Sequence, residues 1–174
     1  GRTDCSNNTL VPNRADTLRE IVDYLRPDIF VACEIQTKAG ADSVLTRSFN
    51  VNGQTAYASA MYNFAGLNQG LNNQLYYNTT KLTLLYQDVI QASPRSIDHY
   101  VLYMNDPNLS SYFDTTFVEV YMCHLKAGSG SSEQNIRAQQ AQELIDFIQV
   151  RPSDRHHIVC GDFNVYNSNE QAYQ

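Results

Sequence analysis

The sequence predicts an α/β fold with a mixed sheet, and three observations support this prediction. Amphipathic helical patterns alternate with short apolar runs near both ends of the chain, whereas the middle is rich in β-forming residues. Helix-strand units around an antiparallel middle require both strand directions in the sheet. Three apolar runs also end on polar groups: Glu34, His124 and the Gly-Asp-Phe-Asn turn at 161–164.

Length and composition predict one domain over residues 1–174. A chain of 174 residues that is 43% hydrophobic can build one substantial core, but it is short for two. The net charge is −6 and the lysines and arginines are scattered, so no basic stripe predicts binding to a phosphate backbone. Any affinity for nucleic acid would have to come from a functional site in which a bound cation supplies the positive charge. No apolar run is long enough to predict a membrane span.

The first half of the chain alternates helix and strand. Apolar residues at helical spacing predict a helix that Pro27 ends, and a strand then leads to Glu34. A weaker helix follows, with Thr37 as a candidate N-cap. The segment after it has no clear period and is expected to be a surface excursion near a site. The predicted ranges are 14–25 (helix), 28–34 (strand), 37–49 (helix) and 50–73 (excursion).

The second half begins with a predicted hairpin, because two β-rich runs flank a short polar connection. Two more strands follow, the second of them central, and then a helix with Ser132 as its candidate N-cap. A final short strand precedes the turn at 161–164. The predicted ranges are 74–78 paired with 81–90 (hairpin), 98–104 and 116–124 (strands), 133–149 (helix) and 157–160 (strand).

The cysteines are expected to be free thiols. Cys33, Cys123 and Cys160 lie inside predicted strands, and no CxxC spacing indicates a metal cluster. Alternation along the strands places Cys33 and Cys123 on the faces opposite Glu34 and His124. Cys5 lies in a polar segment and is expected to be exposed.

The composition predicts a secreted, cell-surface or periplasmic protein of bacterial type. The chain has few lysines, many asparagines and 12 tyrosines. Asn-x-Ser/Thr triplets, which can accept glycans in secreted proteins, begin at Asn7, Asn78 and Asn108.

The polar groups at the three strand ends are those that phosphoester hydrolysis requires. In α/β sheets the carboxyl ends of strands gather functional groups, so these side chains can converge. Glu34 and Asp162 offer hard oxygen ligands for Mg²⁺ or Mn²⁺, and the Asn164 amide can bind a substrate oxygen. His124 adds a donor that can be cationic near neutral pH. A divalent ion there could polarise a phosphoryl group for in-line attack by water.

Each of these residues also has a structural interpretation. Glu34 alone could mark the point where a strand reaches water, His124 alone could be a core histidine, and the turn at 161–164 could be an ordinary Asx turn. Their coincidence at three strand ends favours a site. Arg137 is either a solvated surface charge or a brace for a site carboxylate. The other histidines, His99, His156 and His157, are expected at the surface or at strand edges.

Together these motifs resemble the endonuclease/exonuclease/phosphatase superfamily, the deoxyribonuclease I-like group. The resemblance rests on five motifs in order, which span nearly the whole chain: the helix and strand that end at Glu34, Asn73-Gln-Leu-Tyr-Tyr77, His124-Leu-Lys126, Arg137, and Gly161-Asp-Phe-Asn164. It implies a four-layer α/β sandwich of two mixed sheets flanked by helices, and Mg²⁺-dependent hydrolysis of phosphate esters.

By position, the resemblance implies a role for each motif residue. Glu34 resembles the metal-binding glutamate, and His124 resembles the histidine that contacts the scissile phosphate. Asp162 resembles the aspartate that orients or deprotonates the attacking water and contributes to the metal site. Asn164 resembles the asparagine that binds a phosphate oxygen, and Arg137 has a supporting place.

The chain departs from the family pattern at both ends. The family usually opens with a strand ending in an asparagine and closes with an Asp-His pair, and neither feature is in this sequence. Two functional hypotheses follow. The chain is part of a metal-dependent phosphoesterase, a nuclease or phosphatase within a larger chain or complex, whose substrates could include nucleic acid. Alternatively, it is a non-catalytic binding or assembly domain that retains the fold, or a fragment of a larger secreted protein.

Overall fold

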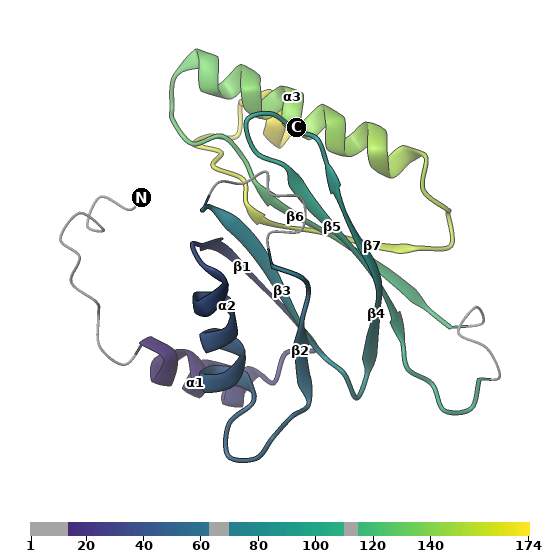
Figure 1. The fold of residues 1–174 in the computed structure, drawn as a ribbon. Helices are drawn as coiled ribbons and strands as arrows, with labels where there is room; N and C mark the ends of the chain where they lie inside the picture. The colour runs from purple at the N-terminus through teal and green to yellow at the C-terminus, as the bar shows by residue number, and fades with distance from the viewer. Residues whose placement is uncertain (1–13, 63–69, 110–114) are drawn as a thin grey trace.

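The computed structural model describes residues 14–62, 70–109 and 115–174 as a four-layer α/β sandwich (Figure 1). Two β-sheets face each other in the middle, and helices cover the outer face of each sheet. This arrangement confirms the fold class predicted from the sequence.

The first sheet has three antiparallel strands in the order β1-β3-β2. These are β1 (Ile29–Ile35), β2 (Tyr57–Ser59) and β3 (Asn72–Asn78). Its outer face is covered by α1 (Arg14–Leu25) and α2 (Lys38–Val44), and a π-helical turn (Leu45–Phe49) extends α2. Thr37 caps α2 as predicted, because its hydroxyl accepts a hydrogen bond from the Gly40 N–H at 3.0 Å.

The second sheet is mixed and has the order β4-β5-β6-β7. Its strands are β4 (Leu82–Ile90), β5 (Ile97–Met104), β6 (Phe117–His124) and β7 (His156–Asp162). Only β6 and β7 run parallel, because α3 (Ser131–Gln149) carries the chain across between them. The N-cap of α3 is Gly130 rather than the predicted Ser132, and a 3-10 turn (Gln171–Tyr173) packs near this helix.

Three apolar clusters hold the four layers together. Between the sheets, Leu75 of β3 packs with Tyr100, Leu102, Val120 and Met122 of the second sheet. The other two clusters join each sheet to its helices: Val22, Phe49 and Tyr76 under α1 and α2, and Ile90, Ile97, Tyr121, Cys123, Leu125 and Leu144 under α3. Each sheet is therefore apolar on both faces, which accounts for the uninterrupted apolar runs in the sequence.

The predicted hairpin between 74–78 and 81–90 is wrong. The first run, β3, pairs with β1 and β2, whereas the second, β4, pairs with β5. The short connection at residues 79–81 thus carries the chain from one sheet to the other. A short connection between two β-rich runs satisfies the hairpin pattern, but the pattern does not specify the pairing partner. Within the predicted excursion at 50–73, β2 adds an edge strand to the first sheet.

The prediction that His99 lies at the surface or at a strand edge is also wrong. His99 is fully buried beneath α3, where its Nε2 lies 2.9 Å from the carboxylate of Glu119. The same carboxylate accepts hydrogen bonds from Tyr121 Oη at 2.7 Å and from Arg151 Nε at 2.9 Å. Burial opposes ionisation of Glu119, but these donors lower its pKa to about 2. The hydrogen bonds satisfy a carboxylate in an otherwise apolar layer and compensate for its burial.

Cys33, Cys123 and Cys160 are free thiols, as predicted, and burial raises the pKa of each. Cys5 lies outside the described residues. Across the described ranges, no helix has the length and apolar character to cross a membrane.

Candidate active site

Two parallel strands bring His124 and Asp162 to one edge of the second sheet. His124 is the last residue of β6, and its register partner in β7 is Asp162. The backbone continues this pairing, because the Leu125 N–H donates to the Asp162 carbonyl at 2.9 Å. The carboxyl ends of both strands therefore coincide, as the sequence predicted.

Glu34 reaches the same place from the first sheet. A register shift between Ala32 and Ile35 interrupts the pairing of β1 with β3, and Glu34 adopts a φ of +62° within it. Positive φ is unfavourable for glutamate, so the surrounding structure must enforce this conformation. The irregularity leaves the Glu34 side chain 51% exposed, with Oε1 3.7 Å from His124 Nε2. This contact joins the two sheets at the edge where β6 and β7 end.

The turn at 161–164 is held by its own backbone and by the loop after His124. The Asn164 N–H donates to Asp162 Oδ1 at 2.9 Å, which is an Asx turn, and Asn164 has a φ of +50°. The Asn164 side-chain amide donates to the Leu125 carbonyl at 3.0 Å. A carboxamide nitrogen carries two hydrogens, and the second has no acceptor among residues 14–62, 70–109 and 115–174, so it can bind a ligand. Residues 161–164 can thus form an Asx turn and also offer a hydrogen-bond donor to a ligand.

His124 is 3% exposed, and its pKa is lowered. Burial is the main cause, and the positive charge of Arg95 acts in the same direction. Asp162 and Glu34 raise the pKa but do not outweigh these effects. The lowered pKa favours the neutral imidazole near neutral pH over the cationic form that the sequence allows.

Arg95 is a residue of this site that the sequence did not reveal. It lies in the turn between β4 and β5, and its Nη1 donates to the carbonyls of Leu125 at 3.0 Å and His124 at 3.4 Å. The guanidinium thereby places a permanent positive charge behind the imidazole. Arg95 and His124 are 29 residues apart, and nothing in the local pattern around either residue indicates that they meet.

Arg137 is a brace, although not for a predicted site carboxylate. It is fully buried on α3, and its Nη2 lies 2.6 Å from Glu170 Oε2. Its Nη1 donates to the carbonyls of Lys126 and Gly128, both at 2.7 Å. Burial alone would raise the pKa of Glu170, but hydrogen bonds from Arg137 and the Tyr166 N–H lower it. Arg137 thus fixes the loop after His124 and the segment after Asn164 to the same helix.

Gln140 adds to this bracing one helical turn further along α3. Its Oε1 accepts from the Lys126 N–H at 2.9 Å, and its Nε2 donates to the carbonyls of Ala92 at 3.2 Å and Arg95 at 3.3 Å. Gln140 is 1% exposed. It therefore connects the loop after His124 with the turn that carries Arg95.

The donor set fits a hydrated hard cation rather than a fully protein-bound one. Within the described parts of the chain, no group of three His, Cys, Asp or Glu side chains could hold a metal ion. Mg²⁺ usually keeps several waters and binds one or two carboxylates together with substrate phosphate oxygens. The half-exposed carboxylate of Glu34 meets that requirement. The free thiols of Cys33, Cys123 and Cys160 do not meet it, because Mg²⁺ prefers oxygen ligands.

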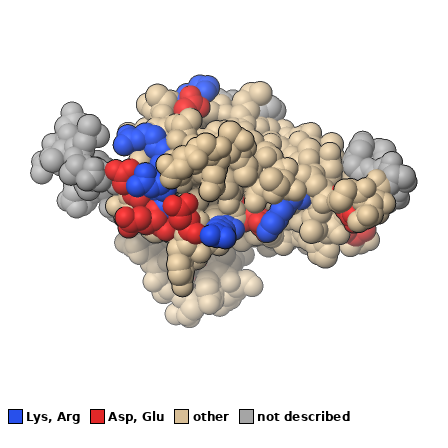
Figure 2. All heavy atoms as spheres, turned by 90° about the horizontal axis from the view of Figure 1, so that it is seen from below, with Lys and Arg blue, Asp and Glu red and all other residues tan. Residues whose placement is uncertain are grey.

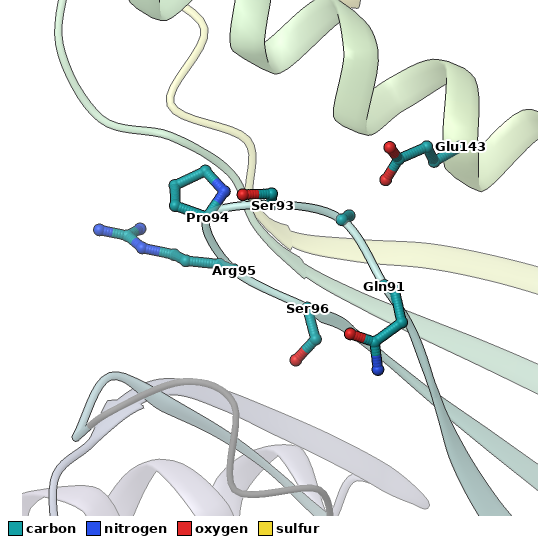
Figure 3. Close-up of a pocket in the computed structure, with 7 residues that line it drawn as sticks. Gln91, Ser93, Pro94, Arg95, Ser96 and Glu143 are labelled. Carbon is teal, nitrogen blue, oxygen red and sulfur yellow. The ribbon is translucent and has the colours of Figure 1, made fainter.

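A hollow of about 290 Å³ lies beside this site, between the turn at 91–96 and α3. Figure 3 shows that Arg95 extends away from Glu143, and that Gln91 and Ser96 also point away from Glu143. Its polar groups do not converge, so this hollow is not the candidate site. The site is instead the edge where Glu34, His124 and Asp162 meet.

Several solved structures that are distant in sequence have the same architecture. An endonuclease/exonuclease/phosphatase family protein from Bacteroides thetaiotaomicron has a TM-score of 0.66 and 13% identity, covering 99% of this chain and 62% of its own. This is the endonuclease/exonuclease/phosphatase fold. The resemblance in the sequence motifs is thus confirmed at the level of the fold.

Two further matches show the range of proteins that share the endonuclease/exonuclease/phosphatase fold. TDP2 from D. rerio, in complex with a single-stranded DNA product, has a TM-score of 0.64 and 15% identity over 92% of this chain and 57% of its own. A mannosyl-6-phosphatase from Bacteroides thetaiotaomicron has a TM-score of 0.65 and 13% identity over 99% of this chain and 64% of its own. No protein-family model and no curated protein matches the sequence.

The chain spans about three fifths of the length of these solved chains. The described residues of this chain form a three-stranded and a four-stranded sheet. The structure brings together Glu34, His124, Asp162 and Asn164, whereas Arg137 lies behind them as a brace.

Proposed function

We propose that this chain carries the site of a metal-dependent phosphoester hydrolase that acts on phosphodiesters by in-line attack of water. The observation that carries the proposal is the contact of Glu34 with His124 across the two sheets, beside Asp162. The fold is shared with a phosphatase and with a protein solved with a DNA product, which supports phosphate-ester chemistry.

Glu34 would hold Mg²⁺ or Mn²⁺. Its carboxylate is half exposed at the junction of the sheets, so it can bind a cation that also contacts solvent and substrate. The bound ion would polarise a phosphoryl oxygen and offset developing negative charge. Asp162 is the second carboxylate at this edge and would add to the negative potential that attracts the cation.

His124 would act as a neutral hydrogen-bond donor to the phosphate. Its lowered pKa favours the uncharged imidazole at neutral pH, and an uncharged imidazole carries one ring N–H. Arg95, behind the imidazole, supplies the permanent positive charge that the neutral histidine lacks. Together they would stabilise charge that develops on the phosphoryl oxygens.

Asp162 and Asn164 would position the water and the phosphate. The Asn164 N–H fixes one oxygen of the Asp162 carboxylate, so that carboxylate is oriented before substrate binds. An oriented carboxylate can accept a proton from the attacking water. The second N–H of the Asn164 amide would donate to a phosphate oxygen, since the first is bound to Leu125.

The decisive experiment is hydrolysis of a panel of DNA, RNA, lipid and sugar phosphates by the purified chain, with Mg²⁺, with Mn²⁺ and with EDTA. We expect metal-dependent hydrolysis of a phosphodiester that falls at least about 10²-fold in His124→Ala and in Asp162→Ala. His156→Ala is the matched control, because this histidine is exposed at the far end of β7.

Activity that persists in EDTA, or in either variant at the level of the control, would contradict the proposal. Absence of hydrolysis across the panel by a folded chain, also when it is part of a longer chain, would favour the non-catalytic binding hypothesis. Sugar-phosphate hydrolysis without phosphodiester hydrolysis would keep the site but exclude nucleic acid as its substrate.

A further inference from the structure

A buried carboxylate lies in the apolar space between the two sheets, and the proposed chemistry does not use it. Asp98 of β5 is 8% exposed, and Asn73 of β3 is 4% exposed. The Asn73 amide nitrogen donates to Asp98 Oδ2 at 2.7 Å and to the Met122 carbonyl at 3.1 Å. Further in, the space between the sheets is filled by apolar and aromatic side chains such as Leu75, Tyr100 and Leu102.

The position of this pair relates it to the site. Asn73 follows Asn72, whose register partner is Ile35 and whose amide donates to the Ile35 carbonyl at 3.1 Å. Asn73 is therefore next to the irregularity in β1 that carries Glu34. On the other sheet, its acceptor Met122 precedes His124 by two residues. One side chain thus links the strand beside Glu34 to the strand that ends at His124.

We propose that Asp98 is a positioning residue that acts through Asn73 to set the spacing between Glu34 and His124. With the Met122 carbonyl as its only acceptor, the Asn73 amide group could rotate and lose that hydrogen bond. The carboxylate of Asp98 fixes its orientation through a short, charge-assisted hydrogen bond. The 3.7 Å contact of Glu34 with His124 spans the same two sheets at the same edge, so its length depends on this link. This inference rests on the proposed function.

The cost of burying Asp98 supports a role other than stability. Burial raises its pKa to about 6, and the hydrogen bond from Asn73 compensates only in part. The nearby titratable groups Tyr100 and Cys123 ionise only to anions, and burial raises the pKa of both, so that they are uncharged at neutral pH. An apolar pair of similar volume would fill the same space without that cost. Such departures from core packing are typical of functional positions.

The test replaces both partners together, so that neither side chain of the Asn73–Asp98 pair is left buried without the other. The double variant Asn73→Leu/Asp98→Leu should fold with stability equal to or above that of the wild type. We expect its kcat to fall at least tenfold while KM changes less than threefold, because orientation and not substrate binding is lost. The isosteric Asp98→Asn keeps an acceptor for Asn73 and should restore kcat to within a few-fold of wild type.

A second readout needs no substrate. The imidazole of His124 is followed by NMR titration, with its resonance assigned by its loss in His124→Ala. We expect the pKa of His124 to change in the double variant and to return towards the wild-type value in Asp98→Asn. Tyr100→Phe is the matched control, since Tyr100 is buried on the same face of β5, two residues further along the strand, and should change neither readout.

Wild-type kcat together with an unchanged His124 titration in the double variant would overturn the inference. If that variant does not fold, Asn73→Ser removes the amide link with a smaller change in volume and is measured in the same two ways. An inactive wild type would overturn the proposed function alone, because the titration still reports whether Asp98 positions His124.

Discussion

Backbone conformation at single residues distinguishes this site from an ordinary sheet edge. Glu34 and Asn164 both have positive φ, and so does Gly161, the last residue but one of β7. Asparagine and glycine tolerate this region, whereas glutamate does not. Strain of this kind persists only where the surrounding structure enforces it, and it gathers at functional sites. Two residues with positive φ, Glu34 and Asn164, are thus also residues that the sequence predicts to take part in the chemistry.

Gly161 allows a close approach that the site requires. Its φ is +126°, and a Cβ there would collide with the backbone carbonyl of Cys123 on the neighbouring strand. We expect Gly161→Ala to lower the free energy of unfolding by roughly 2–5 kcal/mol, from backbone strain and the collision together. Chemical denaturation of the purified variant measures this change.

The matched control for that variant is Gly53→Ala. Gly53 also has a positive φ, +82°, but a Cβ there would meet nothing within 4 Å. The control should lose only about 1 kcal/mol, from backbone strain alone. Equal losses at the two positions would show that the close packing of β6 against β7 is not what requires glycine at 161.

At the scale of elements, the sequence predicted strands better than their partners. The apolar runs located β1, β6 and β7 and the polar group at each end, because an apolar run records burial directly. Pairing depends on contacts between distant segments, so β3 and β4 were wrongly joined in one hairpin. The same limit applies to two other residues. Arg95 contacts His124, 29 residues away in the sequence, and Asn73 contacts Met122, 49 residues away. The burial of His99 could not be predicted, because its partner, Glu119, lies on a different strand.

The helix α3 supports the site through polar side chains on its buried face. We expect Gln140→Met to destabilise the fold by roughly 1–3 kcal/mol, because the partly buried Lys126 N–H would lose its acceptor. Activity should fall as well, since the same side chain holds the carbonyl of Arg95. Thermal or chemical unfolding and a phosphodiesterase assay measure the two effects.

Gln142→Met is the control for that prediction. Gln142 lies on the same helix but is exposed, and its amide contacts only Asp146 one turn away, at 2.7 Å, among the described residues. It should change stability by less than about 0.5 kcal/mol. A Gln140 variant that behaves like this control would mean that α3 does not stabilise the loop after His124.

At the scale of the whole molecule, charge limits the way in which nucleic acid could bind. The net charge is −6, and on the face in Figure 2 lysines and arginines alternate with acidic residues and form no continuous basic patch. Pairs such as Lys81 with Asp28, at 2.8 Å, neutralise part of that positive charge. Binding would therefore depend on the metal site and on a few cations near it, of which Arg95 and Lys126 lie next to the strand ends.

This charge distribution predicts a weak dependence of substrate affinity on salt. If about two phosphates are neutralised, affinity for single-stranded DNA should fall only about tenfold or less between 50 and 200 mM salt, against roughly 10³-fold or more for a protein that neutralises six to ten. The measurement is KM for a short oligonucleotide at fixed Mg²⁺ and varied KCl. A small phosphodiester substrate is the control, and its KM should be nearly constant. A steep loss for the oligonucleotide alone would reveal a phosphate-binding surface beyond these two cations, and the substrate would then be held mainly outside the site at Glu34 and His124.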